Sequence, residues 1–80
     1  MKIRVLTFGI TRDITGAGII DLDLPEGATA ADVDRHFRMH YPALGRLSSL
    51  LLAVNTEYAA PGTLLRENDE VALIPPVSGG

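Results

Sequence analysis

One segment of this 80-residue chain has the apolar spacing of a helix long enough to cover a sheet, and the segments around it resemble strands. Its apolar residues recur every three or four positions: Ala30, Val33, Phe37 and Tyr41. Thr29 and Asp32 have the spacing of a capping box at its start, and Pro42 ends it because the residue before a proline disfavours the α region. A lone helix buries its apolar side by packing on one face of a sheet, which indicates the α+β class.

Five segments are predicted as strands from their apolar patterns: 2–8, 19–24, 50–55, 56–58 and 70–74. Residues 9–18 hold three glycines and are predicted as a loop with room for one helical turn at 12–15, so the first two strands pair as a hairpin. Residues 43–49 are predicted as a loop or a short helical turn. With the first and last strands at the centre of a mixed sheet of four to five strands, the chain is predicted to be a ubiquitin-like β-grasp.

The alternation of side chains along two strands predicts which residues the helix leaves uncovered. Lys2 and Arg4 share the outward face of the first strand, which therefore also carries Phe8. Glu70 marks the outward face of the last strand, which therefore also carries Ile74. If the two strands are neighbours, Phe8 and Ile74 belong to an exposed apolar patch. Such a patch marks a partner surface, whereas singly exposed apolar residues carry no such meaning, and both interpretations stay open.

The composition excludes several classes of protein. The length predicts one domain, residues 1–76, followed by a short tail, residues 77–80. The absence of cysteine excludes disulfides, thiolate metal sites and thiol nucleophiles. A net charge of −3 argues against nucleic acid as a partner. No apolar run approaches ~20 residues and the start lacks a signal peptide's pattern, so we expect no membrane insertion and a cytoplasmic location.

No self-contained active site is apparent in the sequence. His36 and His40 have a spacing that can place two imidazoles on one metal ion, but no third ligand is evident, so we favour a solvated helix flank and expect no metal site. Ser48 and Ser49 lack a nearby base. We therefore expect no cofactor to be bound by this chain itself.

The last six residues form an unusual ending. Pro75 and Pro76 cannot donate to a strand ladder and favour an extended course away from the domain. Gly79 and Gly80 carry no side chains, so the tail is thin enough to enter a narrow channel in another protein while presenting a carboxylate. ATP can activate a carboxylate as an acyl adenylate on a partner enzyme, and a carrier of activated sulfur without cysteine must hold the sulfur there as a thiocarboxylate. A frayed terminus is the plainer alternative.

The chain resembles the sulfur-carrier small subunit of molybdopterin synthase over nearly its whole length. The resemblance is most specific at residues 52–55 (LAVN) and 69–80 (DEVALIPPVSGG). It implies that an ATP-dependent adenylyltransferase of the ubiquitin-activating type adenylates Gly80, which a sulfur donor converts to a thiocarboxylate. The chain then acts as the carrier subunit of a heteromeric sulfurtransferase, delivering sulfur to cyclic pyranopterin monophosphate in a pocket of the large subunit.

The same resemblance implies the partner-binding residues. Phe8, Tyr58 and Ile74 match the family's docking side chains on the sheet. The other partner-binding residues are Pro75, Pro76, Val77 and Ser78, and the reacting end consists of Gly79 and Gly80. Three alternatives remain open. The chain could be a ubiquitin-like modifier, a sulfur carrier for thiamine synthesis or tRNA thiolation, or an interaction module with an inert tail.

Overall fold

The computed structural model describes residues 1–76, which form one sheet with three helices. The elements in chain order are β1 (Lys2–Thr7), α1 (Gly9–Thr15), β2 (Ile19–Asp23), α2 (Ala30–His40), α3 (Pro42–Gly45), β3 (Leu51–Val54), β4 (Glu57–Tyr58) and β5 (Glu70–Ile74). All five predicted strands and the main predicted helix are therefore present, with ends that differ by one residue or two. The predicted tail, residues 77–80, lies outside the described residues.

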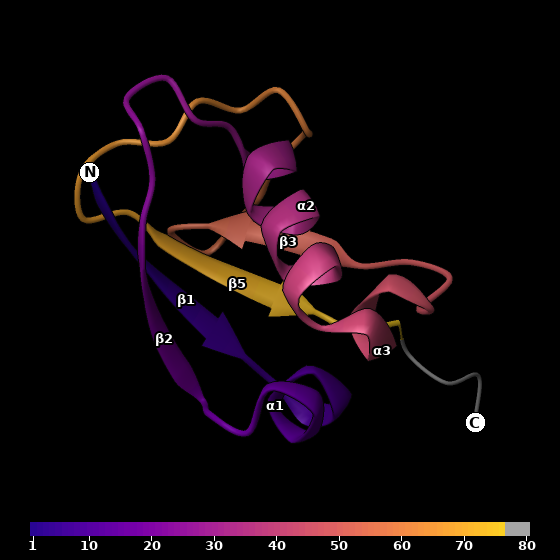
Figure 1. The fold of residues 1–80 in the computed structure, drawn as a ribbon. Coiled ribbons are helices and arrows are strands. Elements are labelled where there is room, and N and C mark those ends of the chain that lie inside the picture. The colour runs from indigo at the N-terminus through magenta and orange to yellow at the C-terminus, as the bar shows by residue number, and fades with distance from the viewer. Residues whose placement is uncertain (77–80) are drawn as a thin grey trace.

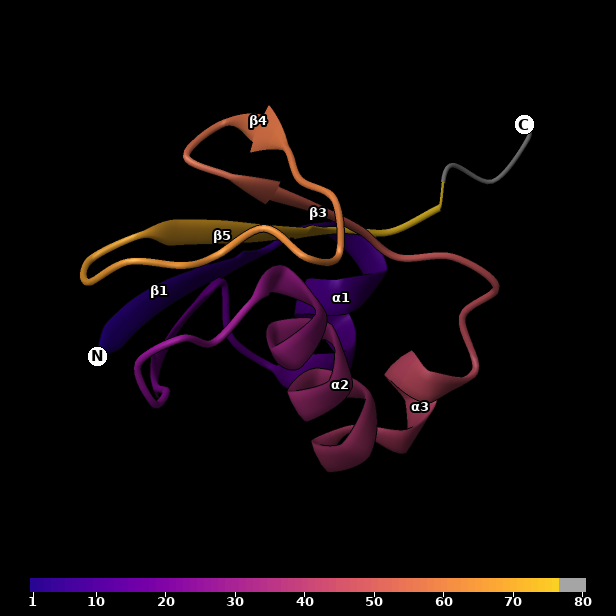
Figure 2. The same ribbon diagram turned by 90° about the horizontal axis from the view of Figure 1, so that it is seen from above.

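The sheet has the strand order β2-β1-β5-β3-β4, with β1 and β5 parallel and the other neighbours antiparallel (Figure 1). The first and last strands are thus neighbours in the middle of a mixed sheet, as predicted. All three helices lie on one side of the sheet, which leaves the other side uncovered by helices (Figure 2). This arrangement is the ubiquitin-like β-grasp.

The core lies between the sheet and α2. Its inward residues on the two central strands are almost completely buried: Ile3, Val5, Val71 and Leu73. Val33 and Phe37 of α2 pack against them, as the helical spacing predicted. Full burial of one such side chain contributes about 1.5–3 kcal/mol, so this thin layer supplies much of the stability of the domain.

Two local devices support the elements that surround the core. At the start of α2, the Asp32 carboxylate accepts hydrogen bonds from the Thr29 backbone N–H at 2.8 Å and from its hydroxyl at 3.2 Å, as the predicted capping box requires. After β3, Asn55 connects two strands: its amide donates to Asp69 at 2.9 Å, and its side-chain oxygen accepts from the Glu70 N–H at 3.0 Å. Asn55 therefore fixes the β3–β4 turn to the start of β5.

The prediction of a loop over residues 9–18 was wrong, because most of this segment forms α1. The Thr11 hydroxyl accepts a hydrogen bond from the Phe8 N–H at 2.8 Å and donates one to the Phe8 carbonyl at 2.7 Å. Gly16 ends the helix in the left-handed region (φ 78°) and donates its N–H to the Arg12 carbonyl at 2.8 Å. The glycines thus begin the helix at Gly9 and follow its end at Gly16 and Gly18, instead of preventing it.

Candidate docking surface

The uncovered face of the sheet carries a row of apolar side chains that crosses all five strands. Residues paired in register on neighbouring strands point to the same face. The pairs Leu6–Ile19, Leu6–Ala72, Ala72–Ala53 and Ala53–Tyr58 connect the edge strand β2 with the edge strand β4. The row is therefore continuous in register. Its middle residue Ala53 is buried, and its two ends are well exposed: Ile19 by 58% and Tyr58 by 74%.

A second apolar row lies beside the first, toward the end of β5. Ile74 is paired in register with Leu51 and is half-buried, whereas Leu51 is 52% exposed. Phe8 has extended backbone angles (φ −139°, ψ 151°), so it continues the alternation of β1 on the face of Leu6, and it is 50% exposed. We call both rows together the apolar half of the open face; its members are Leu6, Phe8, Ile19, Leu51, Ala53, Tyr58, Ala72 and Ile74.

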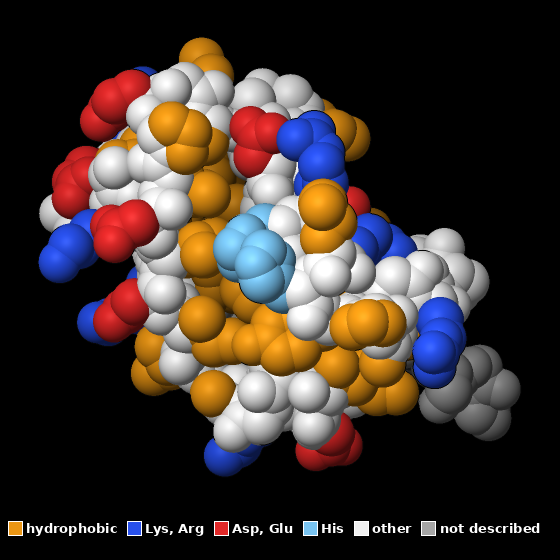
Figure 3. All heavy atoms as spheres, viewed as in Figure 1, with side chains coloured by type: hydrophobic (Ala, Val, Ile, Leu, Met, Phe, Trp, Pro, Cys, Tyr) orange, Lys and Arg blue, Asp and Glu red, His pale blue; other side chains and the backbone are white. Residues whose placement is uncertain are grey.

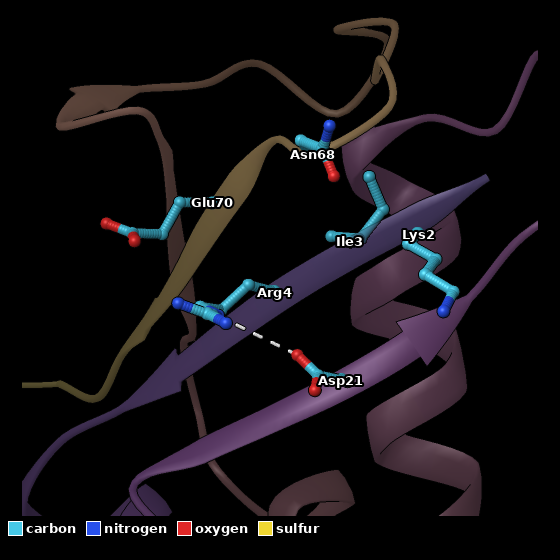
Figure 4. Close-up of a pocket in the computed structure, with 6 residues that line it drawn as sticks. All are labelled: Lys2, Ile3, Arg4, Asp21, Asn68 and Glu70. Atoms are coloured by element: carbon cyan, nitrogen blue, oxygen red, sulfur yellow. Dashed lines mark ion pairs between the residues drawn. The ribbon is translucent and has the colours of Figure 1, made fainter.

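The opposite half of the open face is charged. A shallow cavity of about 330 Å³ is lined there by Lys2, Ile3, Arg4, Asp21, Asn68 and Glu70. Figure 4 shows Arg4 of β1 between Asp21 of β2 and Glu70 of β5, and its Nε lies 3.7 Å from the Asp21 carboxylate. Both side chains of this ion pair are more than half exposed, so the pair itself contributes little stability. We call Lys2, Arg4, Asp21 and Glu70 the charged half of the open face.

The sequence prediction therefore placed Phe8 and Ile74 on the correct face, and the structure places Tyr58 there with them. It missed Ile19 and Leu51, although both are more than half exposed on this face. The alternation in 19–24 assigned no face by itself, and three consecutive leucines at 50–52 conceal the alternation of β3. Only the strand register shows which member of each run points outward.

Pro75 and Pro76 follow β5 at its apolar end and are half-buried. Because β1 and β5 are parallel, this end of β5 lies at the far end of the sheet from the N-terminus (Figure 1). The other predicted tail residues, Val77, Ser78, Gly79 and Gly80, lie outside the described residues. The chain thus leaves the domain beside Phe8 and Ile74.

The remaining polar side chains include two histidines and the helix cap at Asp32. Among residues 1–76, no group of three or more potential ligands could hold a metal ion, and no helix is long and apolar enough to cross a membrane. The rings of His36 and His40 stack with centroids 4.0 Å apart on the helical side of the molecule (Figure 3). Partial burial, and secondarily the charge of His40, lower the pKa of His36 below 6.5. Hydrogen bonds to Thr29, first to its backbone, lower the pKa of Asp32, as its capping role requires.

Comparisons with known proteins agree with this fold. The family model described as the ThiS family matches residues 5–80. The molybdopterin synthase sulfur carrier subunit of Arabidopsis thaliana is 35% identical over 81 residues, which cover 100% of this chain and 84% of that protein. The small archaeal modifier protein 1 of Methanosarcina acetivorans has a TM-score of 0.82 at 26% identity, covering 99% of this chain and 96% of that chain.

A more distant solved structure supports the fold alone. It is the complex of subunits 1 and 2 of the molybdopterin-converting factor from Helicobacter pylori, in which the matching chain has a TM-score of 0.69 at 23% identity, with 100% of both chains covered. Fold, strand order and similarity over the whole length agree: the chain belongs to the ThiS family and is a relative of the sulfur carrier subunits of molybdopterin synthase.

Proposed function

We propose that this chain is the sulfur carrier subunit of a molybdopterin synthase, with Gly80 as the residue that carries the sulfur. The observation that carries the proposal is the similarity, at 35% identity over all of this chain, to a protein named for that role. The apolar half of the open face supports it, because this surface lies where the chain leaves the domain toward Gly79 and Gly80. A carrier needs a docking surface beside its reactive end.

The proposed chemistry has three steps. The Gly80 carboxylate attacks the α-phosphate of ATP on an activating enzyme of the ubiquitin-activating type, giving an acyl adenylate and releasing pyrophosphate. A sulfur donor then displaces AMP, which leaves a thiocarboxylate at Gly80. Finally the thiocarboxylate sulfur bonds to cyclic pyranopterin monophosphate in a pocket of the large subunit, and water cleaves the acyl–sulfur bond, so the sulfur stays on the pterin and Gly80 returns to a carboxylate. This chain contributes the acyl group and its delivery, while both partner proteins contribute the catalytic pockets.

Docking on the large subunit follows from the apolar half. Aromatic side chains near the centre of an interface supply a large share of binding energy, and Phe8 and Tyr58 are both at least half exposed in the free chain. Pro75 and Pro76 start the tail directly beside Ile74 and cannot pair with a neighbouring strand. We therefore assign docking to Phe8, Tyr58 and Ile74, and insertion to the residues from Pro75 onward.

Reconstitution tests this function. The purified chain is incubated with ATP, a ubiquitin-activating-type adenylyltransferase and a sulfide source, and its intact mass is measured before and after the large subunit and the pterin substrate are added. The proposal expects exchange of one oxygen for sulfur at Gly80, followed by loss of that sulfur as molybdopterin forms. A chain that gains sulfur but never transfers it to the pterin would contradict this assignment and point to another sulfur pathway.

A second candidate function is that of a ubiquitin-like protein modifier. One observation favours it: a solved structure with a TM-score of 0.82 at 26% identity is named a small archaeal modifier protein. In that case the activated Gly80 forms an amide with a lysine of a target protein. Mass spectrometry of cell lysates separates the two functions, because a modifier leaves the diglycine remnant on lysines of other proteins and a dedicated carrier does not.

A further inference from the structure

The Thr11 side chain connects three backbone groups at the point where β1, α1 and the end of β5 meet. Thr11 is completely buried, although it is polar and lies next to a surface loop. Its hydroxyl accepts from the Phe8 N–H at 2.8 Å, donates to the Phe8 carbonyl at 2.7 Å, and lies 3.3 Å from the Leu73 carbonyl, a second acceptor for the same proton. The Thr11 side chain thus holds the backbone of both Phe8 and Leu73.

Gly9, the first residue of α1, lies close to Pro75, directly after the end of β5. It has a positive φ of +52°, and a Cβ built on it would lie 3.7 Å from Cγ of Pro75. The proline ring therefore lies over the first residue of α1, at van der Waals distance from the space beside Gly9. The Thr11 hydroxyl thus holds Leu73, and Gly9 leaves the space next to the Pro75 ring free of a side chain, so the residues on both sides of Ile74 lie against the same two-turn helix.

We propose that Thr11 and Gly9 are positioning residues, which set the direction in which the chain leaves β5 relative to the docking surface at Phe8. The inference rests on the proposed function, since a fixed direction matters when the end of the tail must reach a pocket on a docked partner. A misplacement of about 1 Å at a reacting centre can lower the rate about a hundredfold. The helix α1 packs on the side of the sheet away from the docking surface. It thereby affects the rate of sulfur delivery through the direction of the chain after β5, without touching substrate.

Thr15 provides a matched control within the same helix. Its hydroxyl also donates to backbone carbonyls, at 2.9 Å from Thr11 and 3.1 Å from Ala17, and these hydrogen bonds do not reach β5. Thr11→Val and Thr15→Val are therefore the same isosteric exchange of a hydroxyl for a methyl group. Thr11→Ser retains the hydroxyl and serves as the conservative variant.

The first test measures sulfur delivery in the complete complex with the large subunit. At saturating partner concentration, Thr11→Val is expected to lower the single-turnover rate at least about tenfold, while the Kd for the large subunit rises no more than about threefold. Thr15→Val and Thr11→Ser should remain near the wild-type rate. A folded Thr11→Val chain that delivers sulfur at the wild-type rate, or one whose whole loss is in Kd, overturns the proposal.

The second test does not depend on sulfur chemistry. The chain lacks cysteine, so Asp23→Cys and Ser78→Cys introduce two unique positions for nitroxide labels, one on β2 and one beyond the described residues. Pulsed electron resonance then measures the distance distribution between them. Thr11→Val should broaden or shift this distribution, and Thr15→Val should not.

Pro75→Ala serves if Thr11→Val does not fold, because it removes the ring that lies over Gly9 and leaves the core untouched. It is expected to broaden the same distribution. An unchanged distribution in Pro75→Ala and in any folded Thr11 variant overturns the positioning role. If the wild-type chain carries no sulfur at all while the distance distribution still responds, the proposed function fails and the positioning role stands.

Discussion

Truncation of Phe8 to alanine separates a docking role from a core role. Phe8 is 50% exposed in the free chain. An aromatic side chain that becomes fully buried covers ~150–250 Å², so its exposed half offers roughly 75–125 Å² to a partner. At ~25 cal/mol per Å², covering that area contributes about 2–3 kcal/mol to docking. We therefore expect Phe8→Ala to raise the Kd for the large subunit at least about tenfold.

The half that is already covered limits the cost to the free chain. The area of the covered half sets an upper limit of about 2–3 kcal/mol on the loss of folding free energy. The actual loss is smaller because alanine retains Cβ and because an unfolded chain already covers part of its apolar surface. We expect a loss of about 1–2 kcal/mol, which lowers the Tm of a domain of this size by roughly 4–16 °C. The fold therefore persists at assay temperature, and the binding of the folded variant can be measured.

Isothermal titration with the large subunit and thermal unfolding of the free chain are the two measurements. Met39→Ala is the matched control, because Met39 is a 73% exposed apolar residue on α2, on the other side of the sheet. It should change neither quantity appreciably. The reasoning is refuted if Phe8→Ala loses several kcal/mol of stability and its folded fraction still binds with wild-type affinity, since Phe8 would then be a core residue.

Three further predictions concern the tail, the core and the pH dependence. Adding one alanine after Gly80 should abolish sulfur delivery with an unchanged Tm, because the reacting carbon must lie at a fixed reach from the docked domain; a reconstituted assay checks this. Phe37→Ala should cost about 3–5 kcal/mol in denaturant unfolding, because Phe37 is 1% exposed. The pKa of His36 in the folded chain lies below 6.5, so the unfolded chain binds a proton at His36 more readily. The free energy of unfolding is therefore highest above pH 6.5, and it falls as the pH drops through the folded-state pKa of His36. In His36→Gln the fall in Tm between pH 7 and pH 5 should be smaller than in the wild type.

Strand alternation predicted much of this structure because one face of the sheet is buried against the helices and the other face is exposed to solvent. Lys2 and Arg4 cannot enter an apolar core, so their positions alone oriented β1 and placed Phe8 on the open face. In the same way, the spacing of Val33 and Phe37 predicted the buried side of α2. Charged residues inside a strand and apolar periodicity inside a helix are strong local signals of burial.

The segment containing α1 gave no such signal. It is too short for a clear apolar period, its glycines indicate a loop, and the residue that secures it, Thr11, is polar. The stability of α1 comes from tertiary burial of Thr11 and from hydrogen bonds to Phe8, and neither can be read from spacing. The outward positions of Ile19 and Leu51 were missed for a related reason, because only the register with neighbouring strands distinguishes them from their apolar neighbours.

The division of the open face into two halves gives docking an orientation as well as an affinity. A partner surface that is apolar opposite Phe8 and polar opposite Arg4 matches one rotational setting. If the partner were rotated by half a turn about the axis through the face, its apolar groups would cover Arg4 and Glu70. These charges would then lose their water without gaining a partner, at a cost of several kcal/mol. Because β5 ends in the apolar half, in the proposed docking the favoured setting also fixes the side from which Pro75 approaches the partner. In the proposed docking, the charged half therefore selects the rotational setting of the domain on its partner, although it supplies little of the binding energy.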